Sequence, residues 1–142
     1  MFYRSQLITL ILGVILFSCL SCKKSVQIAD KEFAVIPLTG FAVYPATITT
    51  GVATFNGDFI LDRKTLTYTI SCNALKATGV TFTYADGSVA SYDSGSISIV
   101  GQLITATKKL NEKQVKELLA GKWYATVTTS KYPSGEVRGR LK

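Results

Sequence analysis

Most of the chain after residue 32 alternates apolar and polar side chains with a period of two. The segment GVATFNGDFILD, residues 51–62, has one set of alternate positions at Ala53, Phe55, Gly57, Phe59 and Leu61. The segment TLTYTIS, residues 65–71, likewise sets Leu66, Tyr68 and Ile70 against threonines and a serine. A period of two places alternate side chains on opposite faces of a strand. The pattern therefore predicts antiparallel strands with one buried face and one wet face.

Further strands are predicted on both sides of this pair. The linking residues DRKT, 62–65, form a short hairpin, and EFAVIPL, 32–38, is a short β-rich segment. In TGVTFTYADGSVASY, 78–92, Val80, Phe82 and Tyr84 share a face, and Asp86-Gly87 supplies residues with positive φ for a tight turn. In GSISIVGQLITA, 95–106, we expect one strand with Ile97, Ile99 and Leu103 in the core and Gly101 at a bulge.

One helix is predicted within LNEKQVKELLAGKW, residues 110–123. Asn111 suits the N-cap, Gln114 suits its partner in a capping box, and Gly121 suits the C-terminal stop. The apolar positions fall at i, i+3 and i+4, which predicts an apolar stripe that covers the sheet; they are Val115, Leu118 and Leu119.

The C-terminal residues read as a β-hairpin. Trp123, Ala125 and Val127 alternate with polar neighbours, SKYPSGE (130–136) supplies a turn, and residues 136–141 return with Val137 and Leu141 buried. The fold class predicted from these elements is all-β. It is an antiparallel β-sandwich or barrel of about seven or eight strands, with immunoglobulin- or dismutase-like architecture and one short helix before the C-terminal hairpin.

The N-terminus reads as an export signal. Arg4 precedes an apolar run from Leu7 to Phe17, which is shorter than the roughly 20 residues that span a bilayer. A small residue stands directly before Cys19 and before Cys22. This arrangement resembles the lipobox of bacterial lipoproteins, in which the cysteine sulfur carries a lipid; an ordinary secretory signal or a short membrane anchor is the alternative. The frame at Cys19 matches better because Leu16 lies three residues before it, and the frame at Cys22 stays open. The expected organisation is a signal peptide over 1–18 (1–21 if Cys22 is the acceptor), a tether over 19–31 and one β domain over 32–142.

Composition narrows the chemistry that the chain can perform. The net charge is +7, and there is no histidine, so the commonest general base and zinc or copper ligand is absent. The carboxylates Asp58, Asp62, Asp86 and Asp93 lie in separate segments, and no base is at hand to activate Cys72. No phosphate-binding or nucleophile-elbow motif occurs. We therefore expect no catalytic residue, no metal ligand and no cofactor. Positive charge also suits nucleic acid, but an exported protein seldom meets it, and no nucleic-acid partner is expected.

The C-terminal stretch LLAGKWYATVTTSKYPSGEVRGRL resembles the signature of the chordin-type (CHRD) domain. Positions that match the signature are Leu119, Gly121, Tyr124, Thr129, Pro133, Gly135, Glu136, Val137, Arg138, Gly139 and Leu141. The resemblance extends more weakly upstream to about Phe33. It implies structural roles for Gly121, Tyr124, Pro133, Gly135, Glu136, Arg138 and Gly139. The histidines that CHRD domains usually carry are missing, since TFTYADG (81–87) and Thr128 stand in their places. A metal site suggested by the family's likeness to copper-zinc superoxide dismutase therefore lacks its imidazoles.

Glu136 and Arg138 lie two residues apart on the last strand and share a face. This spacing allows a charge-assisted pair, with each other or with neighbouring strands, that clamps the hairpin; a ligand-anchoring pair is the alternative.

The expected function is a non-catalytic binding or scaffolding domain on a lipid-anchored envelope protein, not an enzyme, located on the bacterial outer membrane. Its expected partners are the membrane, through the lipid, and an unidentified envelope protein or polysaccharide. The alternative is an enzyme or a metal-binding protein built on the same sandwich.

Overall fold

The structure, a computed structural model, describes residues 30–93 and 97–142. The predicted signal peptide, Cys19 and Cys22 and most of the predicted tether lie outside the described residues. The elements run in the order β1 (Lys31–Leu38), η1 (Gly40–Ala42), β2 (Val52–Ile60), β3 (Thr65–Asn73), β4 (Ala77–Tyr84), β5 (Val89–Asp93), β6 (Ser98–Val100), β7 (Leu103–Lys109), α2 (Glu112–Leu119), β8 (Trp123–Thr129) and β9 (Val137–Leu141).

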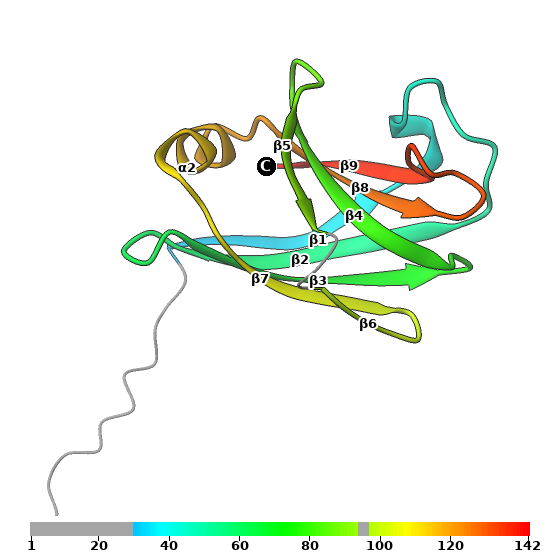
Figure 1. Cartoon of the computed structure of the whole chain (residues 1–142), viewed down its shortest axis with the longest axis horizontal. Coiled ribbons are helices and arrows are strands. Elements are labelled where there is room, and N and C mark those ends of the chain that lie inside the picture. Colours follow the sequence, from blue (N-terminus) through cyan, green and yellow to red (C-terminus); the bar gives the residue numbers. More distant parts are fainter. Residues whose placement is uncertain (1–29, 94–96) are drawn as a thin grey trace, which may run out of the picture.

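The strands form two antiparallel sheets that face each other (Figure 1). The five-stranded sheet has the order β1-β2-β3-β7-β6, and the four-stranded sheet has the order β5-β4-β8-β9. The predicted fold class, an all-β sandwich with one short helix before the C-terminal hairpin, is confirmed. The described part of the chain holds nine strands, more than the seven or eight expected.

The two sheets are joined along one side. Thr39, directly after β1, forms an antiparallel bridge with Arg138 of β9. Each backbone N–H donates to the other residue's carbonyl oxygen at 3.0 Å. Gly139 makes this approach possible, because a Cβ at that position would lie 2.4 Å from the carbonyl oxygen of Pro37. The sandwich is therefore closed at this edge in the manner of a partial barrel.

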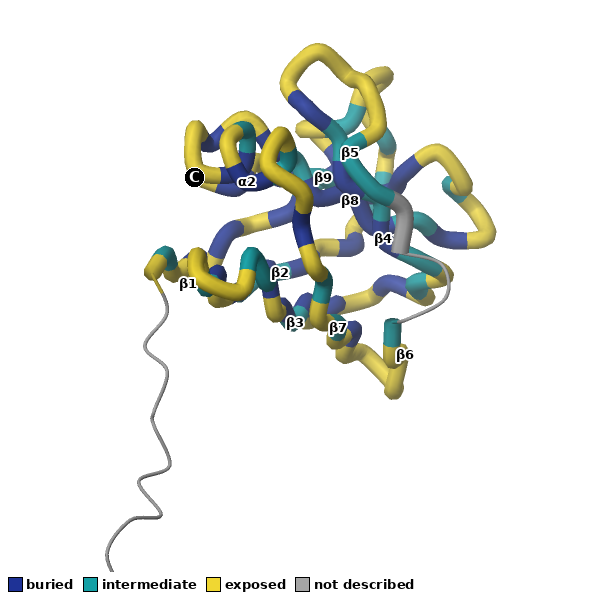
Figure 2. The backbone as a smooth tube through the Cα atoms, turned by 60° about the vertical axis from the view of Figure 1, so that its left-hand side comes forward, coloured by how far each residue is buried: buried dark blue, intermediate teal, exposed yellow. Residues whose placement is uncertain are grey.

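The alternation in the sequence corresponds to burial in the structure, as Figure 2 shows along the strands of both layers. The inward faces meet in an aromatic cluster that crosses from sheet to sheet. Tyr68 of β3 and Phe82 of β4 lie with ring centroids 5.3 Å apart, and Phe82 and Trp123 of β8 lie 5.5 Å apart. Side chains of this size dominate the free energy of apolar burial. The cluster therefore holds the two sheets together.

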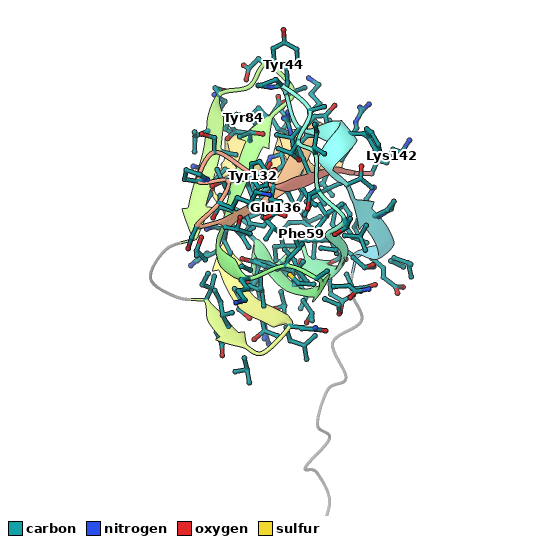
Figure 3. All side chains as sticks on the ribbon, turned by 90° about the vertical axis from the view of Figure 1, so that its right-hand side faces the viewer. Tyr44, Phe59, Tyr84, Tyr132, Glu136 and Lys142 are labelled. Atoms are coloured by element: carbon teal, nitrogen blue, oxygen red, sulfur yellow. The ribbon has the colours of Figure 1, made fainter. Side chains whose placement is uncertain are left out.

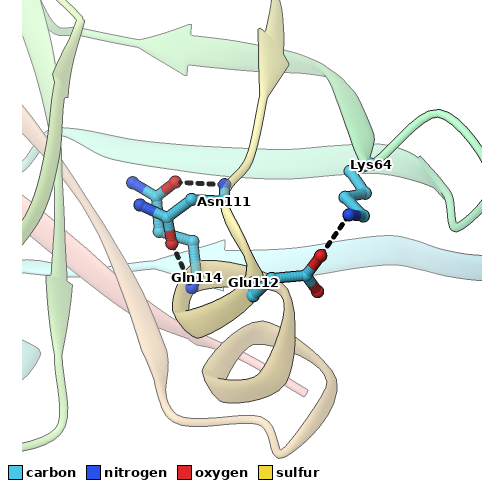
Figure 4. A network of polar contacts seen from close by, with 4 residues as sticks. All are labelled: Lys64, Asn111, Glu112 and Gln114. Carbon is cyan, nitrogen blue, oxygen red and sulfur yellow. Dashed lines mark hydrogen bonds and ion pairs between the residues drawn. The ribbon is translucent and has the colours of Figure 1, made fainter.

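The helix begins as predicted. Asn111 is the N-cap, and its side chain accepts a hydrogen bond from the backbone N–H of Gln114, whose own side chain accepts from the N–H of Asn111 (Figure 4). Lys64, in the β2–β3 turn, forms an ion pair with Glu112. Val115 and Leu118 are buried, but Leu119 is 41% exposed, so the predicted stripe is one residue narrower than expected. A two-residue stripe suffices because α2 contacts the end of the sandwich and not its broad face (Figure 1).

Two details of the predicted strands are wrong. Residues 95–106 do not contain one strand with a bulge, since β6 and β7 form a hairpin and Val100 pairs with Leu103. Gly101 is the first residue of the two-residue turn, with φ +61°, as a type II′ turn requires. The core residue of β7 is consequently Ile104, whereas Ile99 and Leu103 are 38% and 48% exposed. In the β4–β5 turn, only Gly87 of the Asp86-Gly87 pair has positive φ. The loop between Tyr84 and Ser88 has three residues, and in such a loop only the last residue is left-handed.

Candidate functional site

The residues of the C-terminal signature are distributed along the whole β8–β9 hairpin. Gly121 precedes β8, Tyr124 lies in it, and Arg138 and Gly139 lie in β9. Pro133, Gly135 and Glu136 lie in the connecting loop, residues 130–136, at the opposite end from α2. The structure therefore does not gather the signature residues into one pocket. It brings the loop part of the signature beside another segment, residues 39–51, which connects β1 to β2.

Glu136 links these two loops. The side chain is 8% exposed, and its carboxylate accepts hydrogen bonds from the hydroxyls of Thr129 and Thr49, both at 2.5 Å. The Glu136 backbone carbonyl accepts from the Thr47 hydroxyl, also at 2.5 Å. Hydrogen bonds to an ionised acceptor are stronger than neutral ones. The carboxylate therefore holds the 39–51 loop against the C-terminal hairpin.

Tyr132 forms a second link between the loops. Its hydroxyl donates to the backbone carbonyl oxygen of Ile48 at 2.9 Å. The ammonium of Lys131 lies 5.0 Å from the centroid of the Tyr132 ring, within range of a cation–π interaction. Gly135 has φ +131°, a value that side chains disfavour, and this turn carries the chain from Tyr132 back to Glu136.

Two adjoining hollows lie on and between these loops. The first has a volume of about 480 Å³ and is lined by Val43, Tyr44, Pro45, Ala46, Thr47, Ile48, Lys131, Tyr132, Pro133, Ser134 and Gly135. The second, of about 530 Å³, is lined by Ile48, Thr49, Thr50, Ala74, Lys76, Thr129, Ser130, Lys131 and Glu136. Ile48 and Lys131 line both, so the two hollows adjoin at this end of the sandwich, and we call them together the recess.

Three large apolar side chains of the 39–51 loop project into solvent. Phe41 is 91% exposed, Tyr44 is 94% exposed and Ile48 is 92% exposed. In Figure 3, Tyr44 points away from the body of the protein, whereas Tyr132 and Glu136 lie against it. We name Phe41, Tyr44 and Ile48 the apolar tip. Single exposed apolar residues are common, but several on one loop mark an interaction site.

The sequence reasoning did not single out the apolar tip. One feature of the sequence indicates it. Residues 33–57 contain no Asp, Glu, Lys or Arg, and part of this stretch lacks the period of two of a strand. An uncharged, non-periodic stretch outside the core is unusual for a surface loop, whose residues are mostly polar.

Glu136 and Arg138 do not form the pair with each other that their spacing allows. The Glu136 carboxylate is occupied by two threonines, whereas the Arg138 guanidinium lies over the Tyr124 ring at 4.2 Å and donates from Nη2 to the Thr83 hydroxyl at 2.9 Å. The alternative expectation, a contact with other strands of the sheet, fits Arg138, which contacts Tyr124 of β8 and Thr83 of β4. Glu136 lies just before β9 begins, which directs its side chain toward the loops.

The other polar groups singled out from the sequence are dispersed. Within residues 30–93 and 97–142, no three acidic, cysteine or histidine side chains lie close enough together to hold a metal ion. Cys72 is buried, and burial raises the pKa of its thiol, which keeps it in the unreactive neutral form. The pKa of Asp86 is lowered, chiefly by hydrogen bonds from Ser88. No helix in the described part of the chain is long and apolar enough to cross a membrane.

Comparison with known proteins gives one match. No match was found among curated proteins or among solved structures. A family model described as "CHRD domain" matches residues 35–141, which is most of the chain and includes both loops of the recess. At the level of the family, this domain points to binding and not to catalysis. The chain belongs to the CHRD-domain family.

Proposed function

We propose that this protein is a lipid-anchored binding module of the bacterial cell envelope, attached to the outer membrane through Cys19 or Cys22, and that it has no catalytic activity. The proposed binding end is the recess together with the apolar tip. The support for the anchor is the sequence around the two cysteines, and the support for the binding end is the exposure of Phe41, Tyr44 and Ile48.

One observation carries the proposal, namely the direction of β1. The strand begins at Lys31, at the end of the sandwich where α2 lies, and ends at Leu38, directly before the loop with the apolar tip (Figure 1). The eight residues of β1 separate the two ends by about 26 Å at 3.3 Å per residue. A chain anchored through its N-terminus is therefore held at one end of the domain and is free to bind at the other.

The absence of catalysis is supported by the chemistry of the described residues. The carboxylate in the recess, Glu136, has both oxygens engaged by threonine hydroxyls, and the chain has no histidine to act as a general base. No observation on these residues favours the alternative of an enzyme or a metal protein.

Cell fractionation tests the anchor. A variant with both Cys19→Ala and Cys22→Ala should leave the membrane fraction and appear in the soluble fraction, because no sulfur remains to carry a lipid. The matched control is Cys72→Ala, which changes the buried cysteine and should stay with the membrane. Retention of the double variant in the membrane fraction after signal cleavage would contradict the lipid anchor.

Site-specific photo-crosslinking in cells tests the binding end. A photoreactive amino acid in place of Tyr44 should give a defined adduct with an envelope component. The matched control places the same amino acid at Val100, which is 72% exposed and lies on β6, at the opposite edge of the five-stranded sheet from β1. Equal adducts from both positions would mean that the loop end has no preferred partner.

A further inference from the structure

The hydroxyls that hold the two loops of the recess together are engaged within the protein. Recognition of a polysaccharide needs polar groups that can donate hydrogen bonds to its hydroxyls. In the recess, the hydroxyls of Thr47, Thr49 and Tyr132 already donate to acceptors of the protein itself. The Thr129 hydroxyl likewise donates to the carboxylate of Glu136. These four hydroxyls are therefore unavailable to a ligand, and Thr50, Ser130 and Ser134 are the other serines and threonines that line the recess. The large side chains that the 39–51 loop exposes are Phe41, Tyr44 and Ile48.

The charges around the recess have one sign. Among the side chains that line the two hollows, Lys76 and Lys131 are exposed cations. The carboxylate of Glu136 is buried and accepts hydrogen bonds from two threonines. Residues 33–57 add no charge of either sign. The loop end thus combines a protruding apolar tip with a positively charged border.

We propose that the apolar tip inserts into the surface of a lipid bilayer, with Lys76 and Lys131 at the level of anionic headgroups. Phe41, Tyr44 and Ile48 would enter the boundary between headgroups and acyl chains. Tyrosine is favoured at this depth because it has an apolar ring and a polar end. Lysines at the border gain from the negative surface potential. The partner is a lipid surface, and the inference rests on the proposed binding role of this end.

The shape of the tip favours a lipid surface over a folded protein partner. Each of the three side chains is more than nine-tenths exposed, so they project as separate points and do not form a packed patch. Energetically important residues of protein interfaces cluster in well-packed pockets. A fluid lipid surface needs no such complementarity, because it closes around each side chain, and the strength of binding follows the apolar area that is inserted.

The geometry allows contact with the membrane that carries the anchor. A fully extended chain reaches at most about 40 Å from Cys19 to Asp30, or about 29 Å from Cys22. The reach from Cys19 exceeds the about 26 Å that β1 spans along the sandwich and leaves length for the loop beyond Leu38, whereas the reach from Cys22 exceeds this span by only about 3 Å. The apolar tip would then add a contact with the same membrane at the end of the domain opposite the anchor.

Quenching by brominated lipids in vesicles tests the inference on the full-length chain. The native protein has a single tryptophan, Trp123, which is fully buried and gives a constant background. Tyr44→Trp adds a tryptophan at the tip, and Val100→Trp adds one at an exposed apolar position on β6 as the matched control. In vesicles of phosphatidylcholine and phosphatidylglycerol with brominated acyl chains, we expect the added emission of Tyr44→Trp to be quenched at least about twofold more than that of Val100→Trp.

Two further variants separate the apolar contribution to membrane binding from the electrostatic one. Ile48→Ser in the Tyr44→Trp background should reduce the quenching, and Lys131→Glu should reduce it only when phosphatidylglycerol is present. Circular dichroism of each variant should match that of the parent chain. Equal quenching at positions 44 and 100 would overturn the inference. So would a Tyr44 crosslink to a protein or a glycan with no quenching by lipid, a result that leaves the proposed binding role intact.

Discussion

Replacement of Glu136 should weaken the contact between the two loops that form the recess. Its carboxylate is nearly excluded from water, and no cation contacts it among the described residues. Each of its oxygens accepts one hydrogen bond, from Thr49 or from Thr129, and Thr129 is itself only 3% exposed. Leaving a buried hydroxyl without its partner costs the free energy needed to remove that group from water. The link between the two loops therefore depends on this side chain.

Glu136→Met should lower the free energy of unfolding by about 1–3 kcal/mol, because the hydroxyl of Thr129 then lacks its acceptor. Denaturant unfolding measures the change. The matched control is Glu32→Met, at an exposed carboxylate on β1, which should change stability by no more than about 0.5 kcal/mol. Equal losses in the two variants would show that the Glu136 hydrogen bonds do not stabilise the fold.

The same measurement decides how Glu136 and Arg138 are related. Because the two side chains have different partners, the effects of Glu136→Met and Arg138→Met should add within about 0.5 kcal/mol in the double variant. A larger coupling energy would mean that the pairing expected from the sequence forms in solution.

At the scale of the elements, the backbone of β9 lies directly against the backbone at the end of β1. The N–H groups of Thr39 and Arg138 both donate across this junction, and Gly139 leaves room for the Pro37 carbonyl. Backbone cannot move aside as the end of a flexible side chain can. A side chain at position 139 should therefore open the junction.

Gly139→Ala should reduce stability by about 1–3 kcal/mol, the usual cost of forcing extra atoms into a packed region. Hydrogen exchange should show faster exchange at the amides of Thr39 and Arg138. The control is Gly121→Ala, where a Cβ would have no neighbour closer than 3.5 Å and only the backbone, with φ +65°, is strained. That variant should leave both amides protected. Unchanged exchange in Gly139→Ala would contradict the role assigned to this glycine.

The elements differ in how well the sequence predicts them. The strands β2, β3, β4 and β8 alternate cleanly, so their buried faces follow from the period of two. The β6–β7 hairpin was missed because Ile99, Val100, Leu103 and Ile104 are all apolar. Without alternating polar residues, the sequence does not indicate which of these side chains face the core. The capping box was predicted because all its atoms lie within one turn of helix.

The site was less predictable because it depends on contacts between distant segments. Thr49 and Glu136 are 87 residues apart in the chain, and nothing local to either residue indicates the other. The spacing of Glu136 and Arg138 allowed a pair between them, yet the chain turns into β9 between the two residues. Exposure of the apolar tip is likewise a property of the folded loop, since an apolar residue in the sequence is more often buried.

At the scale of the molecule, the two sheets share one core. The aromatic contacts of Tyr68 with Phe82, and of Phe82 with Trp123, connect β3 to β4 and β8. Neither sheet can bury its apolar face without the other. A domain of this size normally unfolds in one cooperative step. The binding end and the anchored end should therefore lose their structure together.

Removal of residues 123–142 should abolish the cooperative unfolding transition. It deletes β8 and β9 and leaves the second sheet with only the β4–β5 hairpin, and an isolated two-stranded hairpin is marginally stable at best. Loss of Trp123 alone should cost about 3–5 kcal/mol, a large share of the about 5–15 kcal/mol that holds a typical domain folded. Thermal unfolding followed by circular dichroism is the measurement. Removal of Lys142 alone, an exposed residue after β9, is the control and should leave the transition unchanged. A truncated chain that still unfolded cooperatively would show that the five-stranded sheet is stable without its partner.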